Sequence, residues 1–309
     1  MNSNTVKAVE AAETRGSEVT AEDVSRRLLE SSATLSYDPA TEVDWQAPLP
    51  ADAHGQSPEW STLYGTPMWA EMTPEQRVTL TRHETGSVMS TGIWFEMILQ
   101  QLILRDQYRG EYTSAEFQFA LTEIADECRH SIMFARACAT MGVPAYRPRR
   151  AAVELARLFK TVGSSAAAYG GILVAEEVLD LMQRANMRDA RVLDLVRTTS
   201  RIHVVEESRH MRFARAEIRD RMRDMSRLRR RTSATAIAVT AYVIITNLIH
   251  QDVYAAAGLD TRRALSEARR NEHHKAMLRT SAAPLMEFLG SCGLLTGPAR
   301  ALYRRAHML

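Results

Sequence analysis

The sequence predicts an all-α fold, and the main reason is where helix-breaking residues are missing. Neither glycine nor proline occurs between Gly171 and Gly258, and no proline occurs between Pro148 and Pro284. A β-protein would need turn residues several times in a stretch of this length. Alanine, leucine, methionine, arginine and glutamate, which are good helix formers, fill it instead. We therefore expect long helices packed into a bundle.

Start and stop signals place the individual helices. Thr73 is an N-cap residue before a proline at the first helical position, and Thr113-Ser114-Ala115-Glu116 has the spacing of a capping box. Gly142-Val143-Pro144 ends the helix that begins there. We expect a short helix near 20–34, long helices near 73–109, 113–141, 149–186, 189–225 and 232–257, and shorter ones near 260–278 and 280–290.

The N-terminal part of the chain differs in composition from the rest. Five of the ten prolines lie between Pro39 and Pro67. Prolines at this density favour extended chain over helix. We expect residues 1–66 to form a partly extended arm with one short helix, and residues 67–309 to form a single helical-bundle domain.

Composition and charge exclude several classes of protein. The 309 residues are 45% hydrophobic and 25% charged with a net charge of +2, which is typical of a soluble globular chain and not of a nucleic-acid-binding one. Three cysteines, Cys128, Cys138 and Cys292, make no disulfide framework. The first twenty residues lack the apolar core of a signal peptide, and the longest apolar stretch, residues 234–249, is shorter than a membrane span. These features predict a cytoplasmic protein with neither a nucleic-acid nor a membrane partner.

Two short motifs inside the predicted helices carry the chemistry. Glu127 precedes His130 by three residues, and Glu207 precedes His210 by the same interval. Residues i and i+3 share a helix face, so each pair can present an oxygen and a nitrogen to one point. One Glu-x-x-His motif is weak evidence, but two-iron bundle sites use two of them plus one glutamate from each of two further helices.

The two further glutamates are found at equal distances from the motifs. Glu96 lies 31 residues before Glu127, and Glu176 lies 31 residues before Glu207, as if a helical hairpin were duplicated. Glu177 adjoins Glu176 and is the alternative, but the shared interval favours Glu176. A lone glutamate in the apolar stretch around Glu96 also needs a partner, because burying an unpaired carboxylate is costly.

Three more residues belong to the predicted site. Asp126 and Glu206 each precede a motif histidine by four residues, so we expect Asp126 to orient His130 and Glu206 to orient His210 by accepting an imidazole N–H. His203 shares the helix face of Glu207 and His210. A core histidine would be the ordinary interpretation, but this face already holds two ligands, so we predict a seventh ligand. The corresponding place in the first half is Glu123, not a histidine.

The donor set indicates the metal. Four carboxylates (Glu96, Glu127, Glu176 and Glu207) and three imidazoles (His130, His203 and His210) form a hard site suited to iron, with manganese as the alternative, rather than to structural zinc. An iron pair bridged by carboxylates can activate dioxygen and oxidise a nearby substrate. We therefore predict two iron ions as cofactors and dioxygen as co-substrate.

The pattern resembles ferritin-like diiron-carboxylate oxygenases, and His203-x-x-x-Glu207-x-x-His210 resembles a narrower group, the p-aminobenzoate N-oxygenase family. The resemblance covers roughly residues 60–260. It implies a ferritin-like four-helix bundle with additional helices. It also implies one iron held mainly by Glu96, Glu127 and His130, and a second held by Glu176, His203, Glu207 and His210.

Activity and partners follow from the same resemblance. We expect a diiron monooxygenase that converts a small amine, most readily an aryl amine, to a hydroxylamine or nitro compound in specialised metabolism such as antibiotic biosynthesis. An external electron donor, a reductase or a ferredoxin, and a homodimeric assembly are the expected partners. The alternatives are a hydroxylase or desaturase of an acyl or carrier-bound substrate, ferritin-type iron or peroxide handling, and a helical interaction protein that has lost its metal.

Overall fold

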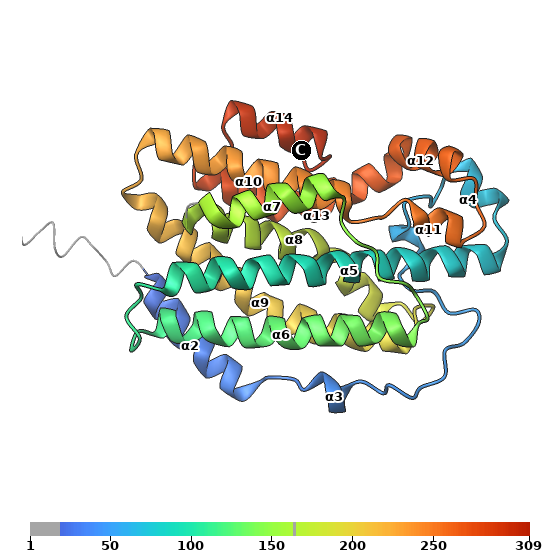
Figure 1. Cartoon of the computed structure of the whole chain (residues 1–309), viewed down its shortest axis with the longest axis horizontal. Helices are drawn as coiled ribbons and strands as arrows, with labels where there is room; N and C mark the ends of the chain where they lie inside the picture. Colours follow the sequence, from blue (N-terminus) through green and yellow to red (C-terminus); the bar gives the residue numbers. More distant parts are fainter. Residues whose placement is uncertain (1–18, 163–164) are drawn as a thin grey trace, which may run out of the picture.

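The prediction of an all-α fold is confirmed. The computed structural model describes residues 19–162 and 165–309, and in these ranges it contains helices and no β-strand, apart from an isolated bridge between His54 and Val192. Four long helices form the centre of the molecule (Figure 1): α5 (Pro74–Gln107), α6 (Ala115–Thr140), α8 (Ser165–Arg188) and α9 (Asp194–Arg223).

These four helices form a ferritin-like bundle. Helix α5 packs against α6 and α8 against α9, and the two pairs join through contacts between α5 and α8 and between α6 and α9. Phe119, Leu173 and Phe213 are fully buried where these helices meet. Burial of apolar side chains such as these is the principal driving force for this packing.

Further helices surround the bundle. Helix α2 (Ala21–Thr34) packs against α6 and α9, and on the other side α10 (Arg227–Asn247) and α13 (Glu272–Ser291) pack against α8 (Figure 1). The remaining helical segments are α3 (Pro39–Glu42), η1 (Pro58–Trp60), α4 (Pro67–Glu71), α7 (Arg150–Val162), α11 (Asp252–Ala256), α12 (Thr261–Arg270) and α14 (Gly297–Arg305).

The expectation of one helix over 149–186 was wrong, because the structure has two helices there, α7 and α8. A Cβ atom placed on Gly171 of α8 would lie 3.5 Å from the Phe159 ring of α7. In one continuous helix these residues would be roughly 18 Å apart along the axis. The sequence does carry a break signal, Gly163-Ser164, but these two residues lie outside the described part of the chain.

Two C-terminal boundaries also differ from those expected. The helix expected over 232–257 is divided into α10 and α11, and the break expected near 279 lies at Asn271 instead. The Asn271 side chain accepts hydrogen bonds from the backbone N–H groups of His273 and His274, and it donates to the carbonyl oxygens of Thr62 and Tyr64. A contact with the distant N-terminal segment therefore decides where this helix begins.

Two segments, Pro74–Gln107 and Arg227–Ala256, are long and apolar enough to span a membrane by length and composition. Both pack against other helices of the bundle, α5 against α6 and α8, and α10 against α8 and α14. Helix α5 also buries two carboxylates, Glu84 and Glu96. Within the bundle, 44% of the apolar window of Pro74–Gln107 and 39% of that of Arg227–Ala256 are buried.

The extended segment between α3 and α4 is held by buried polar contacts with the bundle. The carboxylate of Glu84 on α5 accepts hydrogen bonds from the backbone N–H and the hydroxyl of Thr62, at 2.9 and 2.6 Å, and from the Gln56 side chain at 3.0 Å. The Ser57 N–H donates to the Asn186 side chain of α8. Complete burial raises the pKa of Glu84 from 4.5 to about 7, although the hydrogen bonds from Thr62 oppose this shift.

The raised pKa of Glu84 predicts a pH-dependent stability. Between about pH 4.5 and pH 7 the unfolded chain has lost the proton that the folded chain keeps, so this group destabilises the folded state progressively as pH rises. We expect the free energy of unfolding of Glu84→Gln to increase relative to the parent across this window, by at most about 1.4 kcal/mol per pH unit. The uncharged amide keeps the size of the side chain, and the unpaired Oε1 of Gln56 can accept from it after an amide flip.

The measurement is urea denaturation of both proteins at about pH 5 and about pH 8. At each pH the free energy of unfolding of the parent is subtracted from that of Glu84→Gln, so that the contributions of the other titrating groups cancel. A difference that is the same at both pH values would contradict the assignment of a raised pKa to Glu84.

Candidate metal centre

The seven residues that the sequence predicts as ligands lie together in the middle of the bundle. Each is at least 92% buried, since the most exposed of them retains 8% of its accessible surface. Helix α5 contributes one residue, α6 two, α8 one and α9 three: Glu96; Glu127 and His130; Glu176; and His203, Glu207 and His210.

Two glutamates and two histidines form the centre of this cluster. The Nδ1 atom of His130 lies 3.3 Å from Glu127 Oε2 and 3.1 Å from Glu207 Oε1. The Nδ1 atom of His210 lies 3.0 Å from Glu207 Oε2 and 3.2 Å from Glu127 Oε1. Each carboxylate therefore faces both imidazoles, which is the arrangement that a pair of bridged metal ions would need.

The outer edges of the two imidazoles contact Asp126 and Glu206, but the expected pairing was wrong. His130 Nε2 lies 2.7 Å from Glu206, and His210 Nε2 lies 3.2 Å from Asp126. The reason is the shape of the ring. Because Nδ1 of His130 faces Glu127 on its own helix, Nε2 on the opposite ring edge is directed away from α6 and reaches α9. The pairs therefore cross between helices instead of running along them.

Backbone and guanidinium groups hold these two carboxylates. The N–H of Tyr37, in the segment between α2 and α3, donates to Glu206 Oε1 at 3.1 Å. Arg209 is buried between the two acids, with its Nη2 atom 3.9 Å from Asp126 and 3.8 Å from Glu206. Arg129 contacts Asp126 from the outer side. The N-terminal arm thus takes part in the surroundings of the cluster.

Glu176 and Glu177 point in different directions. Glu176 lies within the cluster, where one of its oxygens is within 4.8 Å of ligand atoms of His203 and Glu207. Glu177 is bound by Arg215, whose Nε donates at 2.7 Å. Glu96 approaches the cluster from α5 and accepts a hydrogen bond from the Ser131 hydroxyl of α6.

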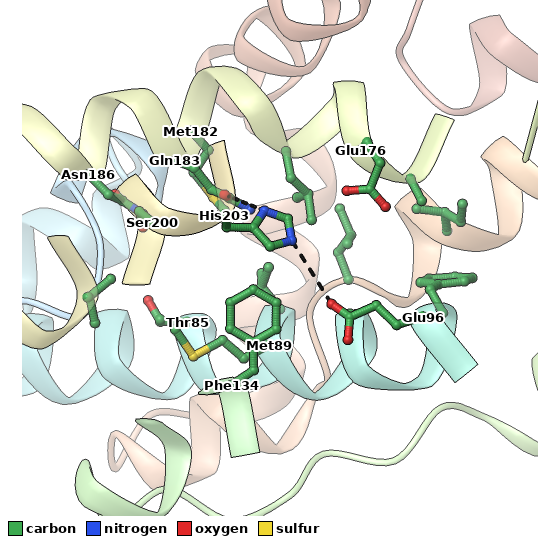
Figure 2. Close-up of a pocket in the computed structure, with 18 residues that line it drawn as sticks. Thr85, Met89, Glu96, Phe134, Glu176, Met182, Gln183, Asn186, Ser200 and His203 are labelled. Atoms are coloured by element: carbon green, nitrogen blue, oxygen red, sulfur yellow. Dashed lines mark hydrogen bonds and ion pairs between the residues drawn. The ribbon is translucent and has the colours of Figure 1, made fainter. Parts of the chain in front are cut away.

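His203 lies at one end of the cluster, and Figure 2 shows it between Glu96 and Gln183. Its Nδ1 is 2.8 Å from the Gln183 side-chain oxygen, and its Nε2 is 4.0 Å from Glu96 and 3.7 Å from Glu207. Because the amide oxygen of Gln183 accepts a hydrogen bond from Nδ1–H, the proton of the neutral ring lies on Nδ1, and the Nε2 lone pair faces the cluster. The ring centroids of His203 and His130 are 4.7 Å apart.

Burial and mutual charge shift the pKa values of the cluster strongly. Burial raises the pKa of Glu96 to about 8, and Glu127 beside it adds to the effect. Burial also raises the pKa of Glu176 far above its usual range. Burial alone would lower the pKa values of His130 and His210, but contacts with the neighbouring carboxylates outweigh it and hold both well above 6.5. The protonated imidazoles of His130 and His210 thus supply positive charge next to the buried carboxylates.

Glu123 is a member of the cluster that the sequence analysis did not include. One of its carboxylate oxygens lies within 4.8 Å of ligand atoms of Glu127 and His210, and its side chain is fully buried. Burial raises the pKa of Glu123 well above 4.5, while the charge of His210 opposes this. The spacing Glu123-x-x-x-Glu127-x-x-His130, equal to that around His203, was the signal that could have identified it.

The donor set fits a pair of hard metal ions. Four overlapping groups of three residues have ligand atoms within 4.8 Å of one another, and all of their members are buried carboxylates or histidines. One oxygen of Glu127 and one of Glu207 are buried without a hydrogen bond of good geometry from any described residue. Oxygen and imidazole donors without thiolate suit iron or manganese.

A cavity adjoins one end of the cluster. It has a volume of about 50 Å³, and Glu96, Glu176 and His203 line it together with apolar side chains such as Val88, Phe134 and Leu179 (Figure 2). A second, almost entirely apolar cavity of about 200 Å³ lies between α5, α7, α8 and α10, and it shares Phe95, Ala175 and Ile244 with the first.

The crossed contacts of the two imidazoles lead to a direct test. In the metal-free protein, Asp126→Asn is expected to shift the ring resonances of His210 more than those of His130, because it removes the charge next to His210 Nε2. Glu206→Gln should do the reverse. Nitrogen-15 spectra of histidine-labelled protein give the measurement, and the opposite assignment would indicate contacts along each helix instead.

Comparison with known proteins connects this geometry to a family. A family model described as p-aminobenzoate N-oxygenase AurF matches residues 18–293. Uncharacterized proteins of Mycobacterium bovis and of two strains of Mycobacterium tuberculosis are each 27% identical over 212 residues. These alignments cover 66% of this chain and 62% of each relative, so the chain spans less than two thirds of their length. The family match includes all four helices that carry the buried cluster, and the chain therefore belongs to the p-aminobenzoate N-oxygenase AurF family.

Proposed function

We propose that this protein is a non-haem diiron oxygenase that uses dioxygen to oxidise a small organic substrate, with N-oxygenation of an amine as its reaction. The observation that carries the proposal is the buried cluster of four carboxylates and three imidazoles on four helices of a chain in this family. The residues proposed to hold the metal ions are Glu96, Glu127, His130, Glu176, His203, Glu207 and His210. How they divide between the two ions remains a prediction of the resemblance.

An iron pair bound here would supply the activation of dioxygen for oxidation of the substrate. The protein's own contribution is orientation of the donors. The carboxylates of Glu206 and Asp126 accept hydrogen bonds from the Nε2–H groups of His130 and His210, so that loss of the Nδ1 protons would leave both Nδ1 lone pairs directed inward. Metal uptake would displace the protons that the cluster holds without metal.

The cavities support a small and largely apolar substrate. Val88, Phe134 and Leu179 form an apolar wall of the cavity that Glu96, Glu176 and His203 also line. A substrate in this cavity would contact apolar side chains next to the cluster. Polar groups of Gln183, Asn186 and Ser200 lie along the same cavity and can orient one polar end of a substrate (Figure 2). The proposal also includes a reductase or ferredoxin as electron donor and assembly as a homodimer. It further includes a cytoplasmic location and a role in specialised metabolism.

Metal content is the first test. Protein from iron-rich medium should contain two metal ions per chain, mostly iron, and Glu127→Ala or His130→Ala should lose at least one of them, because each removes a central donor. Glu177→Gln is the matched control, since its partner is Arg215 and not the cluster. Elemental analysis measures the stoichiometry. A value near zero in both the isolated and the iron-reconstituted parent would refute the diiron proposal.

The oxidation reaction is the second test, and His203 is its most informative residue. The reduced, iron-loaded protein is exposed to oxygen with a panel of aryl and alkyl amines, and mass spectrometry identifies hydroxylamine or nitro products. His203→Ala should keep the fold and most of the iron but change the rate of oxidation or the product distribution, because one neutral nitrogen donor is lost at the cavity. If products, rates and iron spectra all equal those of the parent, His203 is a packing residue.

A further inference from the structure

Glu123 occupies in the first half of the cluster the place that His203 occupies in the second. It precedes Glu127 by four residues, as His203 precedes Glu207. The contacts of Asp126 with His210 and of Glu206 with His130 show that α6 and α9 run antiparallel past each other. Glu123 therefore lies level with His210, whereas His203 lies level with His130 at the other end.

Among the described residues, no hydrogen-bond donor accompanies the buried side chain of Glu123. It retains 0% of its accessible surface, and neither carboxylate oxygen receives a hydrogen bond from the described residues. Phe119, one helical turn before it, packs edge-on against Phe213 and lies beside the His210 ring. A carboxylate in such surroundings is costly to bury unless a cation or a donor accompanies it.

We propose that Glu123 is an additional ligand of the metal ion beside His210. This inference rests on the proposed diiron function. A carboxylate oxygen of Glu123 lies within 4.8 Å of donor atoms of Glu127 and His210, so the three side chains can meet at one ion. The ion would be of the hard, oxygen-preferring class that the rest of the site selects, with iron as the expected occupant.

The proposal makes the two metal positions chemically unequal. The His203 end, with Glu96 and Glu176, lines the cavity, whereas Glu123 is not among the described residues that line it. The resemblance assigns His203 and His210 to one ion, but in the structure His203 groups with Glu96 and His130, and Glu123 groups with Glu127 and His210. With the grouping of the structure, the position beside the cavity would have the neutral imidazole as its extra donor, and the position at the closed, aromatic end would have the anionic carboxylate. An anionic oxygen donor favours the higher oxidation state of iron more than a neutral nitrogen does, so the two ions should differ in their spectra.

The test compares the parent with Glu123→Gln, Glu123→His and the control Glu177→Gln. The amide keeps the size of Glu123 but removes its charge, and histidine restores a donor of the kind found at position 203. Glu177 is also a buried glutamate, but its partner is Arg215. Three quantities are measured with Fe(II) and Co(II) alone as probes: the affinity of each site by chelator competition, the Mössbauer doublets of the iron-57 protein, and the melting temperatures with and without metal.

We expect Glu123→Gln to weaken one of the two sites by about tenfold or more and to change one Mössbauer doublet while the other stays. Without metal its melting temperature should rise, because an unpaired buried carboxylate is gone, and the increase in melting temperature on metal binding should shrink. Glu123→His should recover part of the lost affinity, and Glu177→Gln should leave both sites as in the parent.

Two results would overturn the inference in distinguishable ways. If the parent binds two ions and Glu123→Gln or Glu123→His keeps both affinities and both doublets unchanged, Glu123 is not a ligand, and the diiron proposal stands without it. If the parent itself binds neither probe metal, the diiron proposal and this inference fail together. If Glu123 is a ligand, Glu123→His replaces an anionic oxygen donor by a neutral nitrogen donor and must change one doublet, so this variant decides the question even if the glutamine variant does not fold.

Discussion

The structure depends on the mutual compensation of charges that are buried in the centre of the bundle. Glu127 and Glu207 each face both His130 and His210, so both of these carboxylates have cationic or proton-donating neighbours. Removing one partner would leave an uncompensated charge in a low-dielectric environment, which typically costs several kcal/mol. The cluster is therefore one unit, and helices α6 and α9 must keep their relative register for it to exist.

The crossed contacts explain how this register is held. His130 reaches from α6 to Glu206 on α9, and His210 reaches from α9 to Asp126 on α6, so each imidazole ties the two helices together. The N-terminal arm adds to this arrangement, because the Tyr37 backbone donates to Glu206. The arm and the bundle are thus connected at the same carboxylates that orient the proposed metal ligands.

The two ends of the cluster differ in their surroundings, although the two motifs share one spacing. His203 faces a cavity together with Glu96 and Glu176, whereas the end at His210 is closed by Phe119 and Phe213. In the proposed function, the substrate would therefore lie at the end with the cavity, and the closed end would hold only a metal ion. An approximately two-fold arrangement of the proposed ligands would in this way be combined with a reaction on one side of the cluster.

The all-α class, the long helices and the seven residues that meet in the bundle centre could be predicted from the sequence. The reason is that helical periodicity and the repeated interval of 31 residues can be read from the spacing of residues along the chain. The choice of Glu176 over Glu177 rested on the same interval, and the contact of Glu177 with Arg215 agrees with it. Two features depended on the tertiary structure: the crossed partners of His130 and His210, and the burial of Glu123. Each of them is decided by which side chains of different helices meet. The division of 149–186 into α7 and α8 is different, because the sequence carries a break signal there, Gly163-Ser164. Spacing along one helix states which face a residue occupies, but the residue on the opposing helix determines what that face contacts.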